Sequence, residues 1–274
     1  MIKVDLVAAM GCSRCGRPGV IFQEYSGMHL CTQHFKEDLL HKAKKTVRQS
    51  HWLVPGTRYA VALSGGPASC ALLDFMHHLV GKRKDISLIA VTINNNGPVA
   101  MENAKAITGA SGIPLVTILE DNAILTIPQG NRIDATNPSP FQAHASTEYQ
   151  LALTTEESTF DALVLGYTLE DHAEWVLWNV ISGNTVRKSG CGSEDRRRVR
   201  VIRPFMHIPG QELELYTRLF LKDYYQKAPA ETGNQVDNPI RALLARFYNG
   251  HPGVPYALVN IGEQVTSFRD PGLS

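Results

Sequence analysis

Three cysteines and a histidine near the start of this chain form two closely spaced pairs, and this pattern restricts the fold more than any other feature of the sequence. The pairs are Cys12-x2-Cys15 and Cys31-x2-His34, with 15 residues between them. Two pairs at this spacing can bring four donor atoms to one tetrahedral zinc ion, and four protein ligands leave no coordination position open. We therefore predict a structural zinc site. The alternative is three buried cysteines beside an unrelated histidine.

The remaining cysteines and the composition indicate a protein of a reducing compartment. Cys70 and Cys191 are isolated in the sequence, which does not suit a disulfide framework. The first residues carry no basic segment followed by a long apolar one, so we expect no signal peptide. The sequence also lacks the run of about 18 apolar residues that a membrane span requires. With 43% hydrophobic and 19% charged residues, we expect a globular cytoplasmic protein without a membrane partner.

Short apolar segments alternate with helical patterns from residue 58 onward. The segment RYAVALS predicts a strand that ends at Gly65 and Gly66, and Pro67 suits the first turn of the next helix. Strands separated by helices imply right-handed crossovers. The predicted fold class is therefore α/β, a Rossmann-like parallel sheet with an N-terminal zinc finger and a helical C-terminal end. The expected strands lie at 58–64, 86–93, 114–119 and 161–167, and the expected helices at 36–50, 67–80, 99–111, 143–158, 169–182, 209–222, 237–249 and 254–268.

The predicted organisation has four parts. A zinc finger covers residues 1–35, a linking helix covers 36–55, an α/β nucleotide-binding domain covers 56–222, and a helical segment covers 223–274. Basic residues cluster at 41–58 and again at 82–84 and 196–203, although the net charge is only +1. Such clusters either bind phosphate backbones or form solvated faces, and the sequence leaves both interpretations open.

The turn after the first predicted strand is a candidate phosphate-binding loop. It contains Ser64, Gly65, Gly66 and Ser69 between a strand and a helix. Glycines allow the backbone to approach a phosphate, and the helix N-terminus supplies N–H donors and a favourable dipole. An ordinary tight turn is the alternative, since a Ser-Gly-Gly sequence alone is a weak signal.

Four segments in one order resemble the PP-loop tRNA 2-thiouridine synthetases of the cytosolic tRNA thiolation type. They are CSRCGRPGVIFQEYSGMHLCTQHF, PGTRYAVALSGG, IRPFMHIPGQELELY and RALLARFYNGHPGVPYALV. The resemblance implies that Cys12, Cys15, Cys31 and His34 hold zinc, and that the domain which follows activates the C2 oxygen of a uridine with ATP before sulfur displaces AMP. It also implies a nucleotide site formed by Ser64, Gly65, Gly66, Ser69, Ile93 and Gly166.

The loop and the regions that face the nucleotide depart from the family pattern. The usual loop reads Ser-Gly-Gly-Lys-Asp-Ser, whereas this chain has Pro67 and Ala68 at the two central positions. Lysine would neutralise phosphate charge and aspartate would help to hold magnesium. The family's aspartate after the next strand aligns with Asn94, and its Gly-His-Asn-Leu-Asp-Asp stretch aligns with GYTLED, residues 166–171. ATP and magnesium binding is therefore in doubt.

The cysteines that carry sulfur or an iron–sulfur cluster in active members also have no counterparts at the aligned positions. Those positions hold Pro138, Phe141 and Ala228, whose side chains can neither bind iron nor carry sulfur. We therefore predict no iron–sulfur cluster and no thiol-based sulfur transfer by this chain alone.

Three functional hypotheses follow. The first is a degenerate family member, a pseudoenzyme that binds tRNA or serves as a partner subunit in tRNA uridine 2-thiolation. Its partners would be tRNA, a cysteine-bearing paralogue or a sulfur carrier protein, in a homodimer or heterodimer. The second is an ATP-binding enzyme that still adenylates tRNA or another substrate, with sulfur supplied elsewhere. The third is a nucleotide sensor or scaffold.

Overall fold

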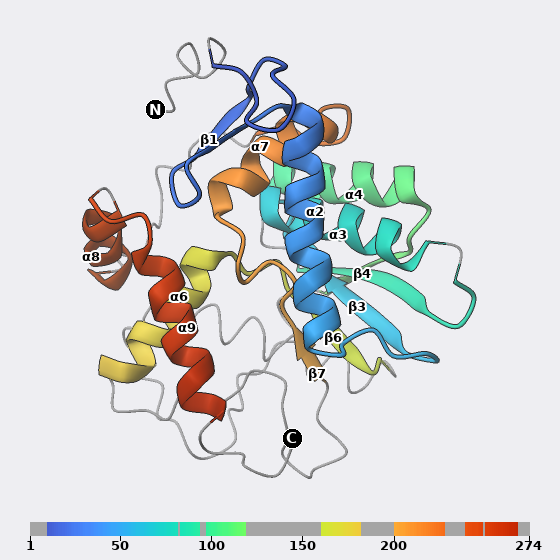
Figure 1. Cartoon of the computed structure of the whole chain (residues 1–274). Helices are drawn as coiled ribbons and strands as arrows, with labels where there is room; N and C mark the ends of the chain where they lie inside the picture. The colour runs from blue at the N-terminus through green and yellow to red at the C-terminus, as the bar shows by residue number, and fades with distance from the viewer. Residues whose placement is uncertain are drawn as a thin grey trace.

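A five-stranded parallel sheet lies at the centre of the molecule, in the strand order β5-β4-β3-β6-β7 (Figure 1). The computed structural model describes residues 10–81, 83–93, 97–118, 160–181, 200–227, 239–248 and 250–267. The strands are β3 (Arg58–Ala62), β4 (Ser87–Ile93), β5 (Leu115–Ile118), β6 (Ala162–Val164) and β7 (Arg200–Ile202). The predicted α/β class with a parallel sheet is confirmed.

Helices follow the strands and form the C-terminal end of the chain, as predicted. Among the described residues, none of the helices combines the length and the apolar character that a membrane span requires. At the left of Figure 1, α6 and α9 lie side by side, with α8 next to them. The helices are α2 (Thr32–Gln49), α3 (Pro67–Val80), α4 (Pro98–Ser111), α6 (Leu169–Ile181), α7 (Gly210–Phe220), α8 (Pro239–Tyr248) and α9 (Val254–Ser267).

Three short strands were not expected from the sequence. β1 (Ile21–Gln23) and β2 (Met28–Leu30) form an antiparallel hairpin within the cysteine-bearing segment, and β7 pairs with β6. Each has only three residues, and this length is too short for an alternation of apolar and polar residues to stand out. The predicted helix at 143–158 lies outside the described residues.

The sheet is buried on both faces, and alternate residues of β3 enter different clusters. Tyr59 and Val61 pack in the larger core with α2, α3 and α7, whereas Ala60 packs in a second core with Val91 and Leu163. Because successive side chains of a strand point to opposite faces, the two clusters mark the two sides of the sheet. A central strand buried on both sides is typical of a parallel sheet, and it explains why this segment is almost continuously apolar.

A polar network holds the β1–β2 hairpin against α2 and α7. The Gln23 amide donates to Glu212 at 3.1 Å and to Asp38 at 3.0 Å. The Tyr25 hydroxyl donates to Glu212 at 2.6 Å and itself accepts from Lys42, whose ammonium also pairs with Asp38 at 2.6 Å. Gln23 and Glu212 are 2% and 1% exposed, so these bonds form away from water and any loss of one leaves a buried polar atom behind.

Electrostatics within this network follow from its burial. Burial raises the pKa of Glu212, although Lys42 and the Tyr25 hydroxyl oppose that shift. Burial, together with the neighbouring Glu212, likewise raises the pKa of Tyr25 well above its ordinary range. Tyr25 therefore keeps its proton and remains the donor to Glu212 throughout the neutral pH range.

We expect the substitution Tyr25→Phe to lower the free energy of unfolding by about 1–3 kcal/mol, because Glu212 loses a donor in a buried position. Urea denaturation followed by circular dichroism measures this change. Tyr224→Phe is the matched control, since Tyr224 is exposed and its hydroxyl has no hydrogen bond among the described residues. Equal unfolding midpoints for the two variants would show that the network does not stabilise the hairpin.

Candidate metal site and phosphate-binding loop

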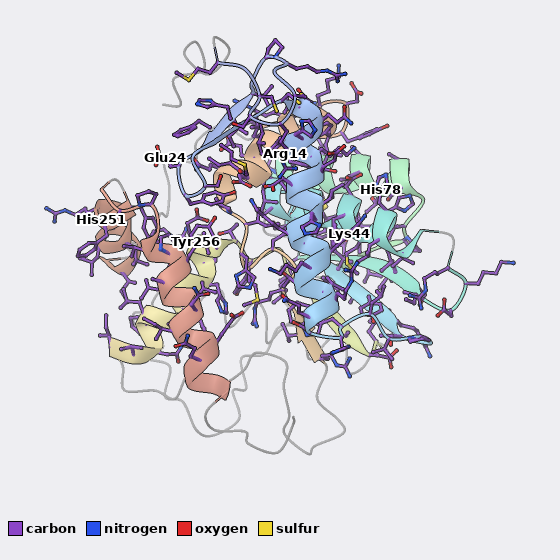
Figure 2. The ribbon with its side chains drawn as sticks, viewed as in Figure 1. Arg14, Glu24, Lys44, His78, His251 and Tyr256 are labelled. Atoms are coloured by element: carbon purple, nitrogen blue, oxygen red, sulfur yellow. The ribbon has the colours of Figure 1, made fainter. Side chains whose placement is uncertain are left out.

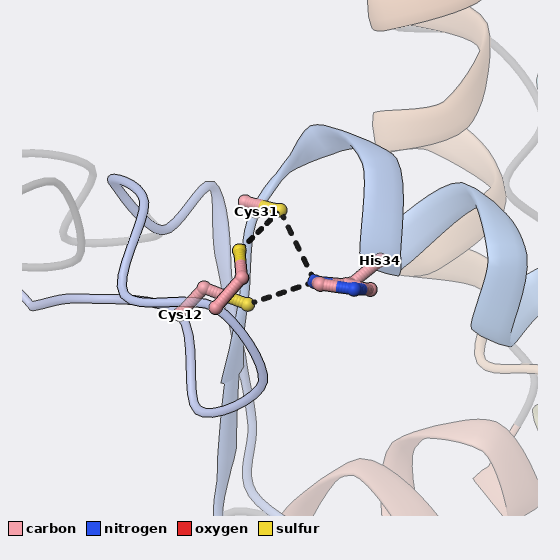
Figure 3. Close-up of side chains that lie close together, drawn as sticks. Cys12, Cys31 and His34 are labelled. Atoms are coloured by element: carbon pink, nitrogen blue, oxygen red, sulfur yellow. Dashed lines mark hydrogen bonds between the residues drawn. The ribbon is translucent and has the colours of Figure 1, made fainter.

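The side chains of Cys12, Cys15, Cys31 and His34 lie together at the N-terminal end of α2, with all four donor atoms within 4.8 Å of one another. The Nδ1 atom of His34 is 3.3 Å from the sulfur of Cys12 and 3.5 Å from that of Cys31 (Figure 3). The sulfurs of Cys15 and Cys31 are 3.7 Å apart. The structure thus brings together the four residues that the sequence predicts as one metal site.

Local backbone geometry explains why these residues converge. The N–H groups of Cys15 and Gly16 both donate to the carbonyl of Cys12, and this tight turn places the first two thiols on one side. Gly16 has a φ of +72°, which a residue without a Cβ adopts freely. Cys31 is the N-cap of α2 and His34 lies in its first turn. The second pair of ligands therefore lies at the N-terminal end of this helix, facing the first pair of cysteines.

The distances fit a single tetrahedral ion. With metal–sulfur bonds of about 2.3 Å and metal–nitrogen bonds of about 2.0–2.1 Å, the edges of a regular tetrahedron would be roughly 3.5–3.8 Å. The measured separations of 3.3, 3.5 and 3.7 Å are close to these values. The donor set therefore fits a metal with all four positions filled by protein.

The two thiols of the first pair have different acidities. Burial tends to raise the pKa of Cys12, but N–H groups of Cys31 and Arg14 and the ring of His34 outweigh it and lower that pKa to about 5. For Cys15, a hydrogen bond from Arg17 lowers the pKa, but desolvation and the thiols of Cys31 and Cys12 outweigh it and raise that pKa. Of this pair, Cys12 is thus the thiol that is mainly a thiolate, the form that binds metal, at neutral pH.

The candidate phosphate-binding loop lies where the direction of the strand connections reverses. From β3 the chain continues to β4 and β5 on one side, whereas β6 leads to β7 on the other. In open α/β sheets, ligands bind outside the carboxyl ends of the strands at such a point. Ser64, Gly65 and Gly66 follow β3, and Gly166 follows β6, so the predicted loop residues meet at this position.

The loop is closely packed against its neighbours. A Cβ atom at Gly65 would lie 1.9 Å from the carbonyl oxygen of Ala100, and the residue has a φ of +79°. A Cβ atom at Gly166 would lie 3.2 Å from the carbonyl of Ala68. Only glycine satisfies the first position, so the turn after β3 is fixed against the start of α4 by backbone contact.

Hydrogen bonds fix the shape of the loop itself. The Ser64 hydroxyl donates to the Ser69 hydroxyl at 3.1 Å, and Ser69 donates to the carbonyl of Gly66 at 3.0 Å. Helix α3 begins at Pro67 and has no side-chain cap. The N–H of Cys70 donates to the carbonyl of Gly66 at 3.0 Å, so the N–H groups of Ala68 and Ser69 are those without an intrahelical partner. These donors face the ligand side of the sheet, and Pro67 itself has no N–H to add to them.

One of the predicted residues, Ile93, contributes differently from the others. Ile93 ends β4, is buried, and belongs to the second core, so its side chain has a packing role. Asn94, Pro138, Phe141 and Ala228, at which the sequence departs from the family pattern, lie outside the described residues. Ser64, Gly65, Gly66, Ser69 and Gly166 are thus the predicted loop residues that the structure brings together.

Sequence reasoning missed Asn103, which ties the loop to the C-terminal part of the chain. Its amide donates to the carbonyl of Gly65 at 3.0 Å and to that of Gln226 at 2.8 Å, and it accepts from the N–H of Gln226 at 2.8 Å. Asn103 is buried in α4, and a polar residue on the apolar side of the predicted helix was the one available signal. Its partner lies 123 residues away in the sequence.

The acidic turn at the start of α6 is occupied by protein contacts. Glu170 accepts from the N–H of Gly210 at 2.9 Å and so caps α7. Asp171 accepts from Thr168 and pairs with Arg241 at 2.7 Å, and Glu174 pairs with the same arginine at 2.9 Å. These carboxylates connect α6 to α7 and α8, and a cation-binding role would compete with those contacts.

Two family models match the chain. The N-terminal LIM domain of the 2-thiouridine synthetase TtuA matches residues 12–36, and the PP-loop domain matches residues 33–246. The tRNA 2-thiolation protein NcsA of Haloferax volcanii is 24% identical, over 91% of this chain and 85% of that protein. The cytoplasmic tRNA 2-thiolation protein 1 of Anopheles gambiae is 23% identical, over 92% of this chain and 77% of that protein.

A solved structure shares the fold. The U34-tRNA thiolase NcsA from Methanococcus maripaludis, with its [4Fe-4S] cluster, superposes with a TM-score of 0.75 at 22% identity, covering 94% of this chain and 88% of that one. The prediction that the chain holds no iron–sulfur cluster is contradicted by this finding and is wrong as it stands. It rested on three aligned positions alone, whereas Cys12, Cys15 and Cys31 are thiols of the kind that also hold such clusters.

We expect Gly65→Ala to lower the free energy of unfolding by at least about 2 kcal/mol more than Gly112→Ala does. Both glycines have a positive φ, but a Cβ at Gly112 meets nothing within 4 Å, whereas one at Gly65 meets the backbone of Ala100. The control therefore carries the backbone strain without the collision. Denaturant titration measures both, and equal losses would show that the turn can move away from α4.

We expect Cys31→Ser to lose the bound metal and to lower the melting temperature by several degrees, because one ligand of four is removed. Elemental analysis of the purified chain for zinc and iron, with thermal unfolding, measures both effects. Cys70→Ala is the control, since this thiol is buried in α3 away from the metal site. Unchanged metal content in Cys31→Ser would contradict the assignment of this ligand.

Proposed function

Because the chain belongs to the PP-loop domain family, which matches residues 33–246, we propose that it is a tRNA-binding subunit in tRNA 2-thiolation that does not transfer sulfur itself. Relatives at 23–24% identity are named as tRNA 2-thiolation proteins. One of them is named as cytoplasmic, and we propose the same location for this chain. The names of these relatives are the reason for proposing tRNA as the ligand. The residues of the loop after β3 are the reason for proposing that catalysis is absent.

The first turn of α3 carries the proposal. In it, Pro67 and Ala68 stand where a loop of this kind needs a cationic side chain for phosphate and a carboxylate for magnesium. The backbone of Ala68 packs against Gly166: a Cβ atom at Gly166 would lie 3.2 Å from the carbonyl group of Ala68. The loop therefore keeps its shape and backbone donors but offers no charged side chain to a nucleotide.

The thiols of the described residues support the same conclusion. Cys12, Cys15 and Cys31 form the metal site, and Cys70 is buried within α3. Burial raises the pKa of Cys70 to about 12, despite a hydrogen bond from Ser69. A protonated, buried thiol is neither a nucleophile nor an acceptor for persulfide sulfur. Sulfur would then come from another chain, a cysteine-bearing paralogue or a sulfur carrier, with which this protein would form a dimer.

One observation favours a second function, adenylation of tRNA with sulfur supplied elsewhere. The Ser64–Ser69 loop lies at the reversal point of the sheet, and the first turn of α3 has no side-chain cap. Backbone donors alone can bind a phosphate at such a helix N-terminus. This enzyme would bind ATP and magnesium and release pyrophosphate in the presence of tRNA.

We expect the full chain to bind a tRNA transcript at micromolar concentration in moderate salt, with neither pyrophosphate release nor 2-thiouridine when ATP, magnesium and sulfide are added. Fluorescence anisotropy measures binding, a coupled assay measures pyrophosphate, and mass spectrometry of nucleosides measures 2-thiouridine. An active thiolase of the family, assayed in parallel, is the positive control.

The outcomes separate the two functions. Pyrophosphate release that depends on tRNA would replace the proposal with the adenylating enzyme. Formation of 2-thiouridine by the chain alone would refute the absence of sulfur transfer. Failure to bind tRNA, in a preparation whose metal content and melting curve show it to be folded, would refute the tRNA-binding role itself.

A further inference from the structure

Basic side chains follow the exposed side of α2 in its second half. His41, Lys44, Lys45 and Arg48, called the basic strip below, are all exposed. Their spacing of three and four residues places them on one side of the helix. The buried residues of the same helix lie on the opposite side and pack in the larger core; they are Phe35, Leu39, Ala43, Thr46 and Val47.

No acidic residue of α2 neutralises the basic strip. Its two acidic residues precede the strip, and the sequence from 39 to 51 contains none. Asp38 already pairs with Lys42 at 2.6 Å and with Arg14 at 3.3 Å, and Glu37 accepts from Gln33 at 3.0 Å. Within the described ranges, no ion pair reaches Lys44, Lys45 or Arg48.

This arrangement differs from that of an ordinary solvated helix. Exposed helix faces usually mix charges of both signs at a separation of four residues, and such pairs stabilise the helix. Here Lys44 and Arg48 have the same sign at that separation, and like charges destabilise the helix instead. The helix dipole favours Arg48 in the last turn, but its effect does not extend to Lys44 and Lys45 in the middle.

We propose that the basic strip is the surface on which the phosphate backbone of tRNA docks, an inference that rests on the proposed tRNA-binding function. Three permanent positive charges and His41 lie along roughly 10 Å of helix, since seven residues rise about 1.5 Å each. Lys44 lies midway along α2 at the front of the molecule (Figure 2). Neutralisation of phosphates by such a strip releases counterions, which supplies the affinity.

A polyanion fits this face better than a protein or a lipid surface does. None of the exposed large hydrophobic residues of the described chain lies on α2, and a protein interface would need such residues at its centre. The apolar side of α2 is buried in the core, so the helix cannot insert into a membrane. Phosphate contacts position a nucleic acid without apolar contacts.

The strip is held rigidly relative to the rest of the molecule. At the start of α2, His34 belongs to the metal site. After its end, the hydroxyl of Tyr59 in β3 donates to the carbonyl of Trp52 at 2.7 Å and accepts from the N–H of Val54 at 2.9 Å. A tRNA bound along α2 would therefore have a fixed position relative to the sheet and its loop.

The experiment measures binding of a tRNA transcript to the full chain at several salt concentrations. The test variant carries Lys44→Gln, Lys45→Gln and Arg48→Gln, which preserve helix-forming side chains and leave the buried side untouched. The control carries Lys105→Gln, Lys222→Gln and Arg246→Gln, three exposed basic residues elsewhere in the chain that have no ion pair among the described residues. Circular dichroism verifies that both variants are folded.

We expect the test variant to bind about tenfold or more weakly near 0.1 M salt, and the slope of log affinity against log salt to fall in magnitude by about 2 to 3. The control should keep both the affinity and the slope of the natural sequence.

If the natural sequence binds tRNA and the test variant has the same affinity and slope, the strip is not the docking surface, although the proposed function stands. If the natural sequence does not bind tRNA, the proposed function fails and this inference fails with it. Loss of binding to phosphatidylserine vesicles alone, with tRNA binding unchanged, would assign the strip to a membrane surface and overturn the proposal.

Discussion

The contact between the turn after β3 and the start of α4 determines how the elements around the ligand side of the sheet are arranged. Gly65 approaches the backbone of Ala100 so closely that no Cβ fits between them. Asn103, one turn further along α4, donates to the carbonyl of Gly65 and exchanges two hydrogen bonds with the backbone of Gln226. Helix α4, the turn after β3 and a distant segment at Gln226 are therefore joined at one point.

A second set of contacts makes α2 the connection between the metal site and the α/β core. Its first turn contributes His34 to the candidate metal site, its middle contributes Asp38 and Lys42 to the network around Glu212, and its buried side packs with α3 and α7. The basic strip occupies the side that remains exposed. One helix thus takes part in the candidate metal site, in a buried hydrogen-bond network and in apolar packing, and these contacts leave the basic strip exposed.

Much of this arrangement could be predicted from local sequence signals. The Cys and His spacing predicted the four side chains that converge at the N-terminal end of α2. The apolar segments predicted β3, β4, β5 and β6 because strands and helices have different periods. The hairpin and β7 were missed because three residues carry too little periodicity. Asn103 and Glu212 could not be assigned partners, because Gln226 and Gln23 lie 123 and 189 residues away in the sequence. Such contacts depend on the folded chain and leave no local pattern.

The same packing also changes what the Ser-Gly-Gly loop indicates. Gly65 is required by its contact with the backbone of Ala100, and a Cβ at Gly166 would crowd the backbone of Ala68 at 3.2 Å, whether or not a nucleotide binds between them. Glycines at these positions are therefore evidence for the fold, and they carry little information about ATP. Lysine and aspartate, the usual residues at positions 67 and 68, act on phosphate and magnesium and are not needed for this packing. Proline and alanine at these positions are therefore informative about phosphate and magnesium binding. The loop keeps its shape without a charged side chain at positions 67 and 68, so the shape of the loop and its capacity for chemistry on phosphate have to be tested separately.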